Sequence, residues 1–526
     1  MLTKTRGLLC AGLTVFALAG CGSNSQTASV ATSTQAGTLA VNPPLRVASL
    51  TASAFAAELG ANTSGQQLLQ LAGTPACGVD FYYLKYWTTA PNGQPTEVSG
   101  ALMVPTGTGA QCSGARPIVL YAHGTTTVST YNIAAITDTT NAANSESAMI
   151  AAVFAAQGYI VVAPNFEGYD ISNLGYHPYV NATVNADDMM DALTAAQTAL
   201  PHSFTPGTTA SGQVYVTGYS EGGYVAMATV KAMQAAGDTV TASAPSSGPY
   251  ALEAFGDAIF LGQVDIGSTI FAPFVTTSYQ NAYNNVYSAT TDVYTSTYAT
   301  GIATLLPSPD SLTQLFQSGA LPEAALFDST PPVTGNTQLD QLLAVPTSPP
   351  YSASQAALFD AGFGSPSLVN NTYRAEYAAD ALAEPDQAEM TLLNGGTLNA
   401  TDVALAAQPA VGLRQDFKLN DMRNGGWSPK EPMLMCGGDQ DPTVFFQVNT
   451  GVMAAEWSPL VSAGLVQVLD LNGTPAGPFA PLQGAFQSTY AAMVAAEGAS
   501  TAIQSYHATE APFCMVAARD FFAQVP

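Results

Sequence analysis

Basic residues are scarce in this chain. Lysine and arginine together contribute 12 of the 526 residues, against 37 aspartates and glutamates, and the formal net charge is −25. A protein that binds the phosphate backbone of a nucleic acid, or an anionic membrane surface, needs a basic face. The composition therefore excludes nucleic acids and anionic membrane surfaces as partners, and it favours a neutral substrate.

Charge of either sign is scarce as well, whereas apolar residues are plentiful. Charged residues make up 9% of the chain and apolar residues 47%, and much of the remaining polarity comes from Thr, Ser, Asn and Gln. This composition is typical of exported proteins. Because a single hydrophobic core usually stops growing at about 250–300 residues, the length predicts one large domain with an insertion, or two domains.

The N-terminus has the features of an export signal. Lys4 and Arg6 precede an apolar stretch, residues 7–17, which is too short to span a bilayer. Residues 18–21 (Leu-Ala-Gly-Cys) follow and resemble a bacterial lipobox. The resemblance implies cleavage before Cys21 and a lipid on its sulfur; the alternative is an ordinary secretory signal with an incidental cysteine.

The export signal predicts where the protein resides. We expect residues 1–20 to be a lipoprotein signal peptide and residues 21–45 to be a flexible tether, because the latter are rich in small polar residues without an apolar period. The predicted location is the cell envelope, with the membrane contacted only through the lipidated Cys21. Gly22 after the cysteine favours the outer membrane if the organism is Gram-negative.

Cysteine is rare, with six residues in the whole chain. Cys10 leaves with the signal peptide and Cys21 carries the lipid. The four that remain are Cys77, Cys112, Cys436 and Cys514. An even number in an oxidising compartment predicts disulfides, and their spacing does not resemble a zinc site. Of the three possible pairings we favour Cys77–Cys112 and Cys436–Cys514, since each pair then lies within one part of the fold.

Short apolar runs alternate with helical segments over the first half of the chain. The strands are expected over 79–90, 96–104, 117–122, 158–164, 214–217 and 239–245, and the helices over 146–157, 187–200 and 222–236. Continuous apolar runs are typical of strands buried on both faces. The order predicts an α/β fold with a mostly parallel sheet that helices cover on both faces.

The alternation stops in the middle of the chain. Residues 252–428 lack clear buried strands and contain helical stretches between Pro and Gly clusters, and the strand pattern resumes at 432–436 and 465–471. We therefore predict a core formed by residues 46–251 and 429–526, with a large, mainly helical cap inserted between the two parts.

The strongest chemical signal is a glycine-flanked serine. Residues 218–222 read Gly-Tyr-Ser-Glu-Gly and lie directly between a predicted buried strand and a predicted helix. In this context the motif indicates a nucleophile elbow, a sharp turn that exposes a serine hydroxyl. Ser220 is the predicted nucleophile.

The serine needs a base, and a base in turn needs an acid to orient it. In this motif's fold the chain order is serine, acid, histidine, and His507 is the one histidine of four that follows Ser220. The acid should follow the strand predicted at 432–436. Asp441 fits that position best, and Asp439 is its rival.

The reaction also needs backbone N–H groups that stabilise an oxyanion. One should belong to Glu221, the residue after the nucleophile. The second should come from the loop after the strand at 117–122, where Thr125 is the first choice and Thr126 the next. His123 is expected to brace this loop, and the Glu221 side chain is not expected to act as an acid.

These residues together resemble the bacterial lipase and esterase branch of the α/β-hydrolase superfamily, including secretory-lipase-like proteins. The resemblance covers residues 79–250 and 430–515, and it departs from the family at Asn165, where an aspartate is expected. It implies the α/β-hydrolase fold and hydrolysis of small-molecule or lipid esters through an acyl-enzyme at Ser220, without a metal or an organic cofactor.

Two other functions are compatible with the sequence. The same triad cleaves amides, so a serine peptidase acting on short peptides is one alternative. A non-catalytic surface lipoprotein that keeps the fold as a binding module is the other. Labelling by a fluorophosphonate, which requires an activated serine, separates the binding module from both enzymes.

Tyrosines recur at helical spacing inside the predicted cap. Tyr279, Tyr283 and Tyr287 are four residues apart, and Tyr294 and Tyr298 follow. Such a stripe indicates packing of the cap onto the core; lining of a substrate pocket is the alternative.

Overall fold

The computed structural model describes residues 29–30, 33–200, 207–347 and 353–525. The predicted signal peptide, Cys21 and His202 therefore lie outside the described residues. Within the described ranges, no helix is both long and apolar enough to cross a membrane.

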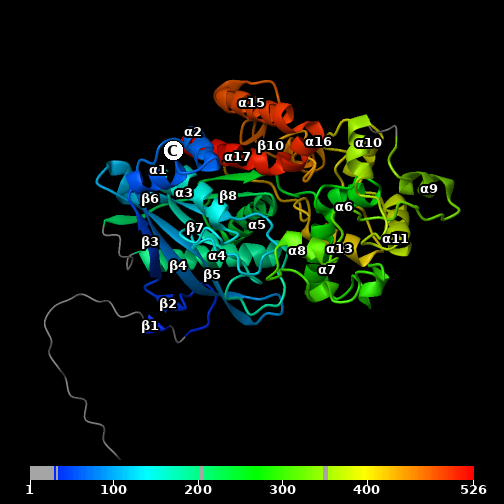
Figure 1. Cartoon of the computed structure of the whole chain (residues 1–526), viewed down its shortest axis with the longest axis horizontal. Helices are drawn as coiled ribbons and strands as arrows, with labels where there is room; N and C mark the ends of the chain where they lie inside the picture. Colours follow the sequence, from blue (N-terminus) through cyan, green and yellow to red (C-terminus); the bar gives the residue numbers. More distant parts are fainter. Residues whose placement is uncertain (1–28, 31–32, 201–206, 348–352, 526) are drawn as a thin grey trace, which may run out of the picture.

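A mixed nine-stranded sheet forms the centre of the described structure, with strand order β11-β10-β9-β8-β6-β7-β5-β4-β3 (Figure 1). Its strands are β3 Leu45–Leu50, β4 Gly78–Thr89, β5 Pro95–Thr106, β6 Gly114–Ala122, β7 Ile160–Pro164, β8 Thr208–Tyr219, β9 Ala242–Ser246, β10 Met433–Gly437 and β11 Val466–Asp470. The strands from β7 to β11 in this order pair in parallel, whereas β5, β4 and β3 pair antiparallel. The predicted mostly parallel sheet is confirmed.

Helices cover both faces of the sheet. Helices α4 and α5 pack together against strands β7, β8 and β9, while α17 packs against β8, β9 and β10 together with α2 and α3. The core helices are α1 Ala52–Leu59, α2 Thr63–Ala72, α3 Asn144–Val153, α4 Ala182–Ala199, α5 Glu221–Ala236, α14 Val452–Trp457, α15 Ala480–Glu497, α16 Ala499–Ala502 and α17 Tyr506–Phe522. Strands β6 and β7 end in fully buried runs, as their continuous apolar sequence predicts.

The folded part of the chain begins earlier than the predicted tether allows. The Gly37 and Ala40 amides donate to backbone carbonyls of β4, at 2.8 Å each, and Leu39 is buried. A short antiparallel pair, β1 (Ser29–Val30) with β2 (Val41–Asn42), accompanies this contact. Residues 37–42 therefore belong to the core, because Leu39 buries its side chain beside the edge of the sheet.

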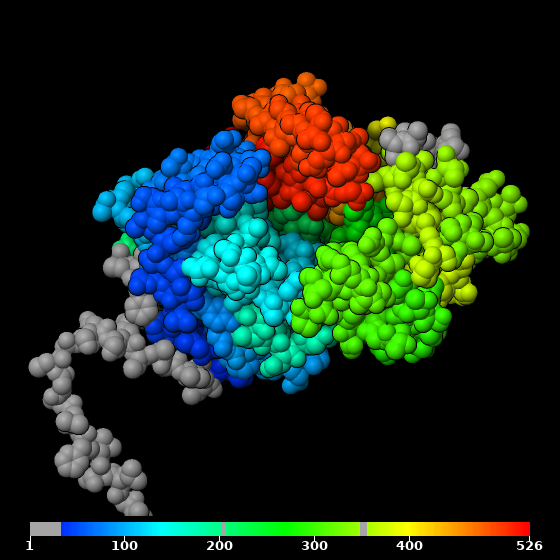
Figure 2. All heavy atoms as spheres, in the orientation of Figure 1, coloured from blue at the N-terminus to red at the C-terminus, as the bar shows by residue number. Residues whose placement is uncertain are grey.

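The stretch predicted as a cap contains a series of helices joined by long turns and irregular segments where it is described. It contains α6 Leu252–Phe260, α7 Ser268–Tyr283, α8 Leu312–Gln317, α9 Thr337–Leu343, α10 Ala353–Asp360, α11 Asn371–Ala383, α12 Gln387–Leu393 and α13 Gly412–Asn420. We call residues 252–428 the cap. Figure 2 shows the cap (green to yellow) beside the blue and cyan part of the core, with the red C-terminal segment next to the junction.

Buried arginine–aspartate pairs hold the cap helices together. Arg414 on α13 donates to both carboxylate oxygens of Asp257 on α6, at 2.9 and 2.7 Å, and to Asp380 on α11 at 3.1 Å. Arg423 contacts Asp421 and Asp386 at 2.7 Å each. Bidentate pairing of this kind satisfies a buried guanidinium that would otherwise be costly.

A group of buried carboxyls lies between α4 and the strands. Asp188 accepts a hydrogen bond from the Tyr86 hydroxyl at 2.5 Å, and Asp191 accepts one from Thr88 at 2.8 Å. Burial and neighbouring carboxylates raise the pKa of Glu167 well above its ordinary value. Burial likewise raises the pKa of Asp188 to about 7 and that of Asp191 to about 6. These groups hold protons in the folded state at pH values where the unfolded chain has lost them.

We therefore predict that the protein becomes less stable as the pH rises. Acids whose pKa is raised on folding stabilise the folded state below that pKa, and this contribution starts to fall above the unfolded pKa of about 4. The free energy of unfolding should decrease by a few kcal/mol, in order of magnitude, between about pH 5 and pH 8. Denaturant unfolding at several pH values measures this decrease in the free energy of unfolding.

The carboxyl group that causes this slope can be identified by substitution. Glu167→Gln and Asp188→Asn should each flatten the pH dependence, whereas Asp138→Asn, at an exposed loop carboxyl, should leave it unchanged. A stability that rises between pH 5 and pH 8 would contradict the prediction.

Candidate active site

Ser220 occupies a strained turn between β8 and α5. Its backbone has φ +62° and ψ −127°, a conformation that residues with a side chain rarely adopt. The turn is possible because its neighbours lack side chains: a Cβ on Gly218 would lie 2.2 Å from the Gly222 carbonyl oxygen, and one on Gly222 would lie 2.0 Å from that of Ala122. The geometry is that of the predicted elbow.

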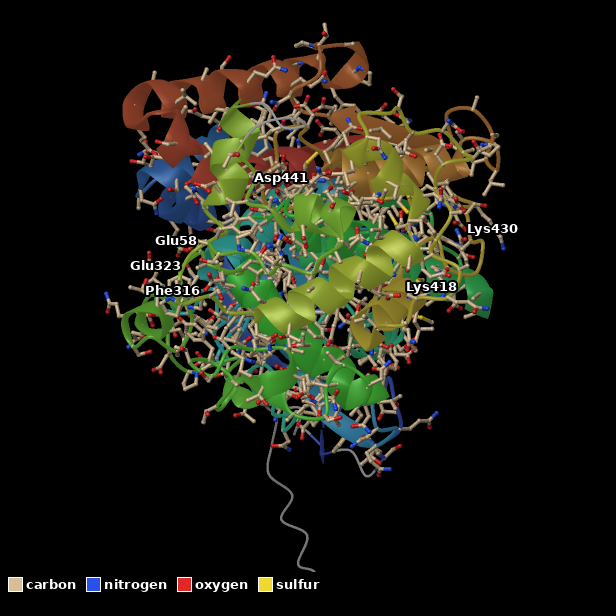
Figure 3. The ribbon with its side chains drawn as sticks, turned by 90° about the vertical axis from the view of Figure 1, so that its right-hand side faces the viewer. Glu58, Phe316, Glu323, Lys418, Lys430 and Asp441 are labelled. Carbon is tan, nitrogen blue, oxygen red and sulfur yellow. A yellow bond between two sulfur atoms is a disulfide. The ribbon has the colours of Figure 1, made fainter. Side chains whose placement is uncertain are left out.

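His507 and Asp441 are hydrogen-bonded to each other. His507 Nδ1 lies 2.6 Å from Asp441 Oδ2, and the other carboxylate oxygen accepts the amides of Thr443 at 2.9 Å and Val444 at 3.2 Å. These amides fix the carboxylate on the turn after β10. Figure 3 shows Asp441 close to the red C-terminal helices, one of which carries His507.

The remaining imidazole nitrogen is available for chemistry. His507 Nε2 is buried, and no described residue forms a hydrogen bond with it. The imidazole packs against the ring of Tyr219, with centroids 4.9 Å apart, and Tyr219 directly precedes Ser220. The fold thus brings the base and its acid beside the elbow.

Asp439, the rival acid, forms no hydrogen bond with His507 among the described residues. Its amide donates to Asp470 at 3.1 Å. Asp439 and Asp441 belong to one tight turn, in which the Asp441 amide donates to the Gly438 carbonyl oxygen at 3.0 Å. Of the two, only Asp441 is oriented to hold the histidine.

Glu510 is a site residue that the sequence analysis missed. It is fully buried one turn after His507, and its Oε1 lies 3.9 Å from His507 Nδ1. The same oxygen accepts hydrogen bonds from the Tyr219 hydroxyl, at 2.8 Å, and from Ser247. Burial and the charge of Asp441 raise the pKa of Glu510 well above its ordinary value. The i, i+3 spacing after a candidate base was the available signal.

The nitrogen and carboxylate oxygens of Asp441, His507 and Glu510 lie within 4.8 Å of one another, and among the described residues this is the one group with the spacing of metal ligands. His507 Nδ1 is already engaged by Asp441, however, which favours an acid–base site over a metal centre.

The two predicted oxyanion donors face no competing acceptor. The amides of Thr125 and Glu221 donate to no acceptor in the part of the chain that the structure describes. The Thr125 loop lies against the elbow, because a Cβ on Gly124 would lie 3.6 Å from that of Ser220. The Thr126 carbonyl oxygen, by contrast, accepts the Tyr169 hydroxyl at 2.8 Å, which holds the far side of the loop.

His123 connects this loop to the next strand. One ring nitrogen lies 2.7 Å from the Gly124 carbonyl oxygen and the other 3.1 Å from that of Asn165, as a bracing residue requires. The Asn165 side-chain amide donates to Ser99 at 2.9 Å. An aspartate, which the resemblance led us to expect at this position, could not donate that hydrogen bond when ionised.

The Glu221 side chain is engaged elsewhere. Its Oε1 lies 2.6 Å from His177 Nε2, both side chains are fully buried, and His177 Nδ1 lies 2.8 Å from the Glu167 carbonyl oxygen. The hydrogen bond between Glu221 and His177 anchors the first turn of α5. The backbone amide of Glu221 is therefore held in place while its carboxyl is occupied.

Both predicted disulfides are present, Cys77–Cys112 and Cys436–Cys514. The second joins β10 to α17, five residues before Asp441 and seven after His507. His507 lies in the first turn of α17. The disulfide therefore ties the helix that carries the histidine to the strand that leads to the acid.

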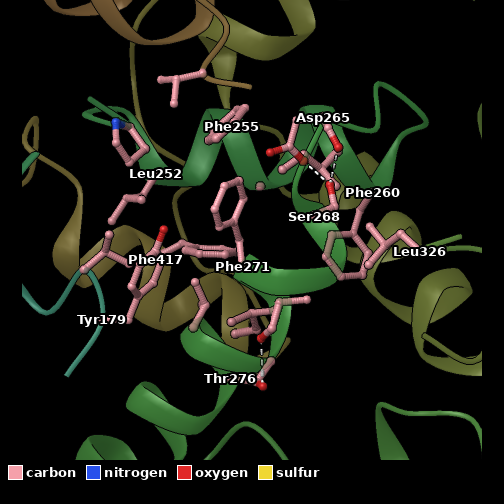
Figure 4. Close-up of a pocket in the computed structure, with 18 of the residues that line it drawn as sticks. Tyr179, Leu252, Phe255, Phe260, Asp265, Ser268, Phe271, Thr276, Leu326 and Phe417 are labelled. Atoms are coloured by element: carbon pink, nitrogen blue, oxygen red, sulfur yellow. Dashed lines mark hydrogen bonds between the residues drawn. The ribbon is translucent and has the colours of Figure 1, made fainter. Parts of the chain in front are cut away.

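An apolar cavity of ≈ 850 Å³, open mouth included, begins at Ser220 and extends between the core and the cap (Figure 4). Its wall is mostly hydrocarbon and includes Leu252, Phe255, Phe260, Phe271, Leu326 and Phe417. None of the five cap tyrosines of the sequence analysis belongs to this wall. Tyr279 is buried and donates to the Val180 carbonyl at 3.1 Å, which agrees with the packing interpretation.

Known proteins resemble this chain mainly in structure. A model of the prolyl oligopeptidase family matches residues 145–260, the segment that contains the elbow. The rice cell wall degrading esterase LipA from Xanthomonas oryzae is similar over 92% of this chain and 97% of its own, with 24% identity and a TM-score of 0.63. A protein from Legionella pneumophila is similar over 91% and 96%, with 18% identity and a TM-score of 0.58. No curated protein matches the sequence.

Proposed function

We propose that this chain, which has the α/β-hydrolase fold, is an exported serine esterase that cleaves neutral carboxylic esters through an acyl-enzyme at Ser220. The observation that carries the proposal is the 2.6 Å contact between His507 Nδ1 and Asp441 beside a strained serine turn. Structural packing alone requires neither the positive φ of Ser220 nor a buried Nε2 without a hydrogen bond on the partly exposed His507.

The proposed mechanism assigns one task to each group. Ser220 attacks the ester carbonyl while His507 Nε2 accepts its proton, and Asp441 holds the tautomer that leaves Nε2 unprotonated. His507 then protonates the departing alcohol. Water repeats the sequence on the acyl-enzyme and releases the acid. Each step moves a proton between the histidine and an oxygen at the reacting centre.

The tetrahedral intermediates need stabilisation of their negative oxygen. The free amides of Thr125 and Glu221 are the proposed donors, since such preorganised N–H groups are aimed at charge that develops in the transition state. The N-terminus of α5, which begins at Glu221, adds a favourable dipole.

The cavity supports a substrate with an apolar chain. Its wall carries no lysine or arginine, and the two carboxyl groups in it belong to Glu221 and Asp265. An anionic substrate would lose its hydration there without gaining a basic partner. The similarity to the esterase LipA agrees with ester hydrolysis.

A serine peptidase is the second candidate, because the match to the prolyl oligopeptidase family includes the elbow. The apolar wall of the cavity favours the ester, since a peptide carries amide groups that need hydrogen-bond partners. A surface binding module remains the third candidate.

Export is part of the proposal. The two disulfides support an oxidising compartment. Lipidation at Cys21, and with it attachment to the cell envelope, rests on the lipobox resemblance alone. Mass spectrometry of the protein purified from a bacterial membrane fraction tests it through the mass of the N-terminal peptide.

The proposed function is tested with the purified protein and a fluorophosphonate probe. We expect the label on Ser220, located by peptide mass spectrometry, together with turnover of p-nitrophenyl esters from acetate to palmitate. Labelling with peptide cleavage but without turnover of any ester would replace the esterase by the peptidase. A folded protein that shows neither labelling nor turnover would exclude both enzymes and favour the non-catalytic binding module.

A further inference from the structure

Asp265, in the wall of the apolar cavity, has one carboxylate oxygen without a hydrogen-bond partner among the described residues. Asp265 lines the cavity and is only 4% exposed. Its Oδ1 accepts the Ser268 hydroxyl, but its Oδ2 has no hydrogen-bond partner among the described residues. Figure 4 shows Asp265 and Ser268 on the same wall, near Phe255 and Phe260. Buried polar atoms without a partner are rare in folded proteins and call for an explanation.

The other polar groups of this wall are wholly or partly engaged. The Thr276 hydroxyl contacts the Tyr294 hydroxyl at 2.5 Å and the Ala272 carbonyl oxygen at 2.9 Å. The Glu221 carboxyl is bound to His177 through Oε1, while its Oε2 has no hydrogen-bond partner among the described residues. Asp265 is therefore one of two carboxyls in this cavity with unused hydrogen-bonding capacity, and it is the one that belongs to the cap and not to the elbow. Burial raises its pKa to about 8, so at neutral pH the group carries a proton and can both donate and accept.

Asp265 lies in the wall of the cavity next to the turn that carries Asp441. The amide of the next residue, Ile266, donates to the Pro442 carbonyl oxygen at 2.9 Å, and Pro442 directly follows Asp441. The negative charge of Asp441 acts on Asp265 as well. Asp265 and Ser220 line the same cavity.

We propose that Asp265 determines specificity by hydrogen-bonding a hydroxyl group on the acyl chain that enters the cavity, so that the enzyme prefers hydroxyacyl esters to plain alkanoyl esters. The inference rests on the proposed esterase function. A site that offers a buried hydrogen-bonding group to a substrate hydroxyl discriminates against the analogue without it, because the group is then left unpaired.

The test compares methyl octanoate with methyl octanoates that carry a hydroxyl at carbon 3, 6 or 7, with acid release followed by titration at constant pH. Methanol is too small to fill the cavity, so the acyl chain must enter it. We expect kcat/KM of the wild type to be about three- to tenfold higher for at least one hydroxy ester than for methyl octanoate. Asp265→Leu should abolish that preference while retaining turnover of methyl octanoate.

Two further variants separate recognition from structure. Asp265→Asn keeps a donor and an acceptor and should retain part of the preference. Thr276→Val removes a satisfied hydroxyl from the same wall and should leave the ratio of the two kcat/KM values unchanged. A ratio that is equal in the wild type and in Asp265→Leu overturns the inference while the esterase function stands. Failure to hydrolyse any ester would overturn both.

Discussion

The Ser220→Ala and His507→Ala variants are each expected to lower kcat of ester hydrolysis by about 10⁵- to 10⁶-fold. Without the hydroxyl no acyl-enzyme forms, and without the imidazole no base takes its proton. The measurement is steady-state hydrolysis of the best p-nitrophenyl ester by each variant. The double variant should be no slower than either single variant, because the two groups act as one unit.

The matched control is Ser246→Ala. Ser246 ends β9, its hydroxyl is buried, and its carbonyl oxygen accepts the Ser220 amide at 3.0 Å. This variant removes a buried hydroxyl beside the elbow and should keep kcat within a few-fold of the wild type. Residual activity of Ser220→Ala above about 1% of the wild type, in protein free of wild-type contamination, would contradict the assignment of the nucleophile.

The features that could be predicted from the sequence are those with local causes. The elbow depends on five consecutive residues, and its glycines are required by carbonyl oxygens that the strand–turn–helix geometry places near them. The buried strands β6, β7 and β8 show as continuous apolar runs for the same reason. His507 followed from chain order, since no other histidine comes after Ser220.

Elements without a periodic signal escaped prediction. Strand β3 lies at the edge of the sheet and leaves Leu45 63% exposed and Val47 40% exposed, so apolar side chains do not alternate with polar ones there. Helix α17, which carries His507, was not among the predicted helices. Pro512 lies inside it, and a proline normally indicates a helix boundary, but here it falls in the second turn of the helix.

Contacts between distant segments were equally invisible to the sequence analysis. Glu510 becomes a site residue because Tyr219 and Ser247, from two other strand ends, point at it. The composition showed few basic residues, but not that Arg374, Arg414 and Arg423 are buried within the cap. In the same way, Asp265 could not be identified as a cavity residue from the sequence, because it lines the cavity at Ser220 only once the cap has packed onto the core.

The Asp441→Asn variant should lower kcat by about 10³- to 10⁴-fold and leave the fold intact. The asparagine can place its NH₂ group toward His507 Nδ1, which then accepts a hydrogen bond and carries no proton. The proton moves to Nε2. A protonated Nε2 cannot accept the proton of Ser220. Because Asp441 also accepts two backbone amides through Oδ1, the asparagine oxygen can retain those hydrogen bonds and keep the turn.

Asp439→Asn is the matched control, because it makes the same chemical change two residues away. Asp439 does not contact His507, so kcat should stay within a few-fold of the wild type. Asp441→Ala adds a second comparison: it leaves no NH₂ group at Nδ1, and Glu510 is 3.9 Å away. We expect Asp441→Ala to be less impaired than Asp441→Asn, and Glu510→Gln in that background to remove the difference. Equal loss in Asp439→Asn and Asp441→Asn would contradict the assignment of Asp441, since only one of the two carboxylates reaches the histidine.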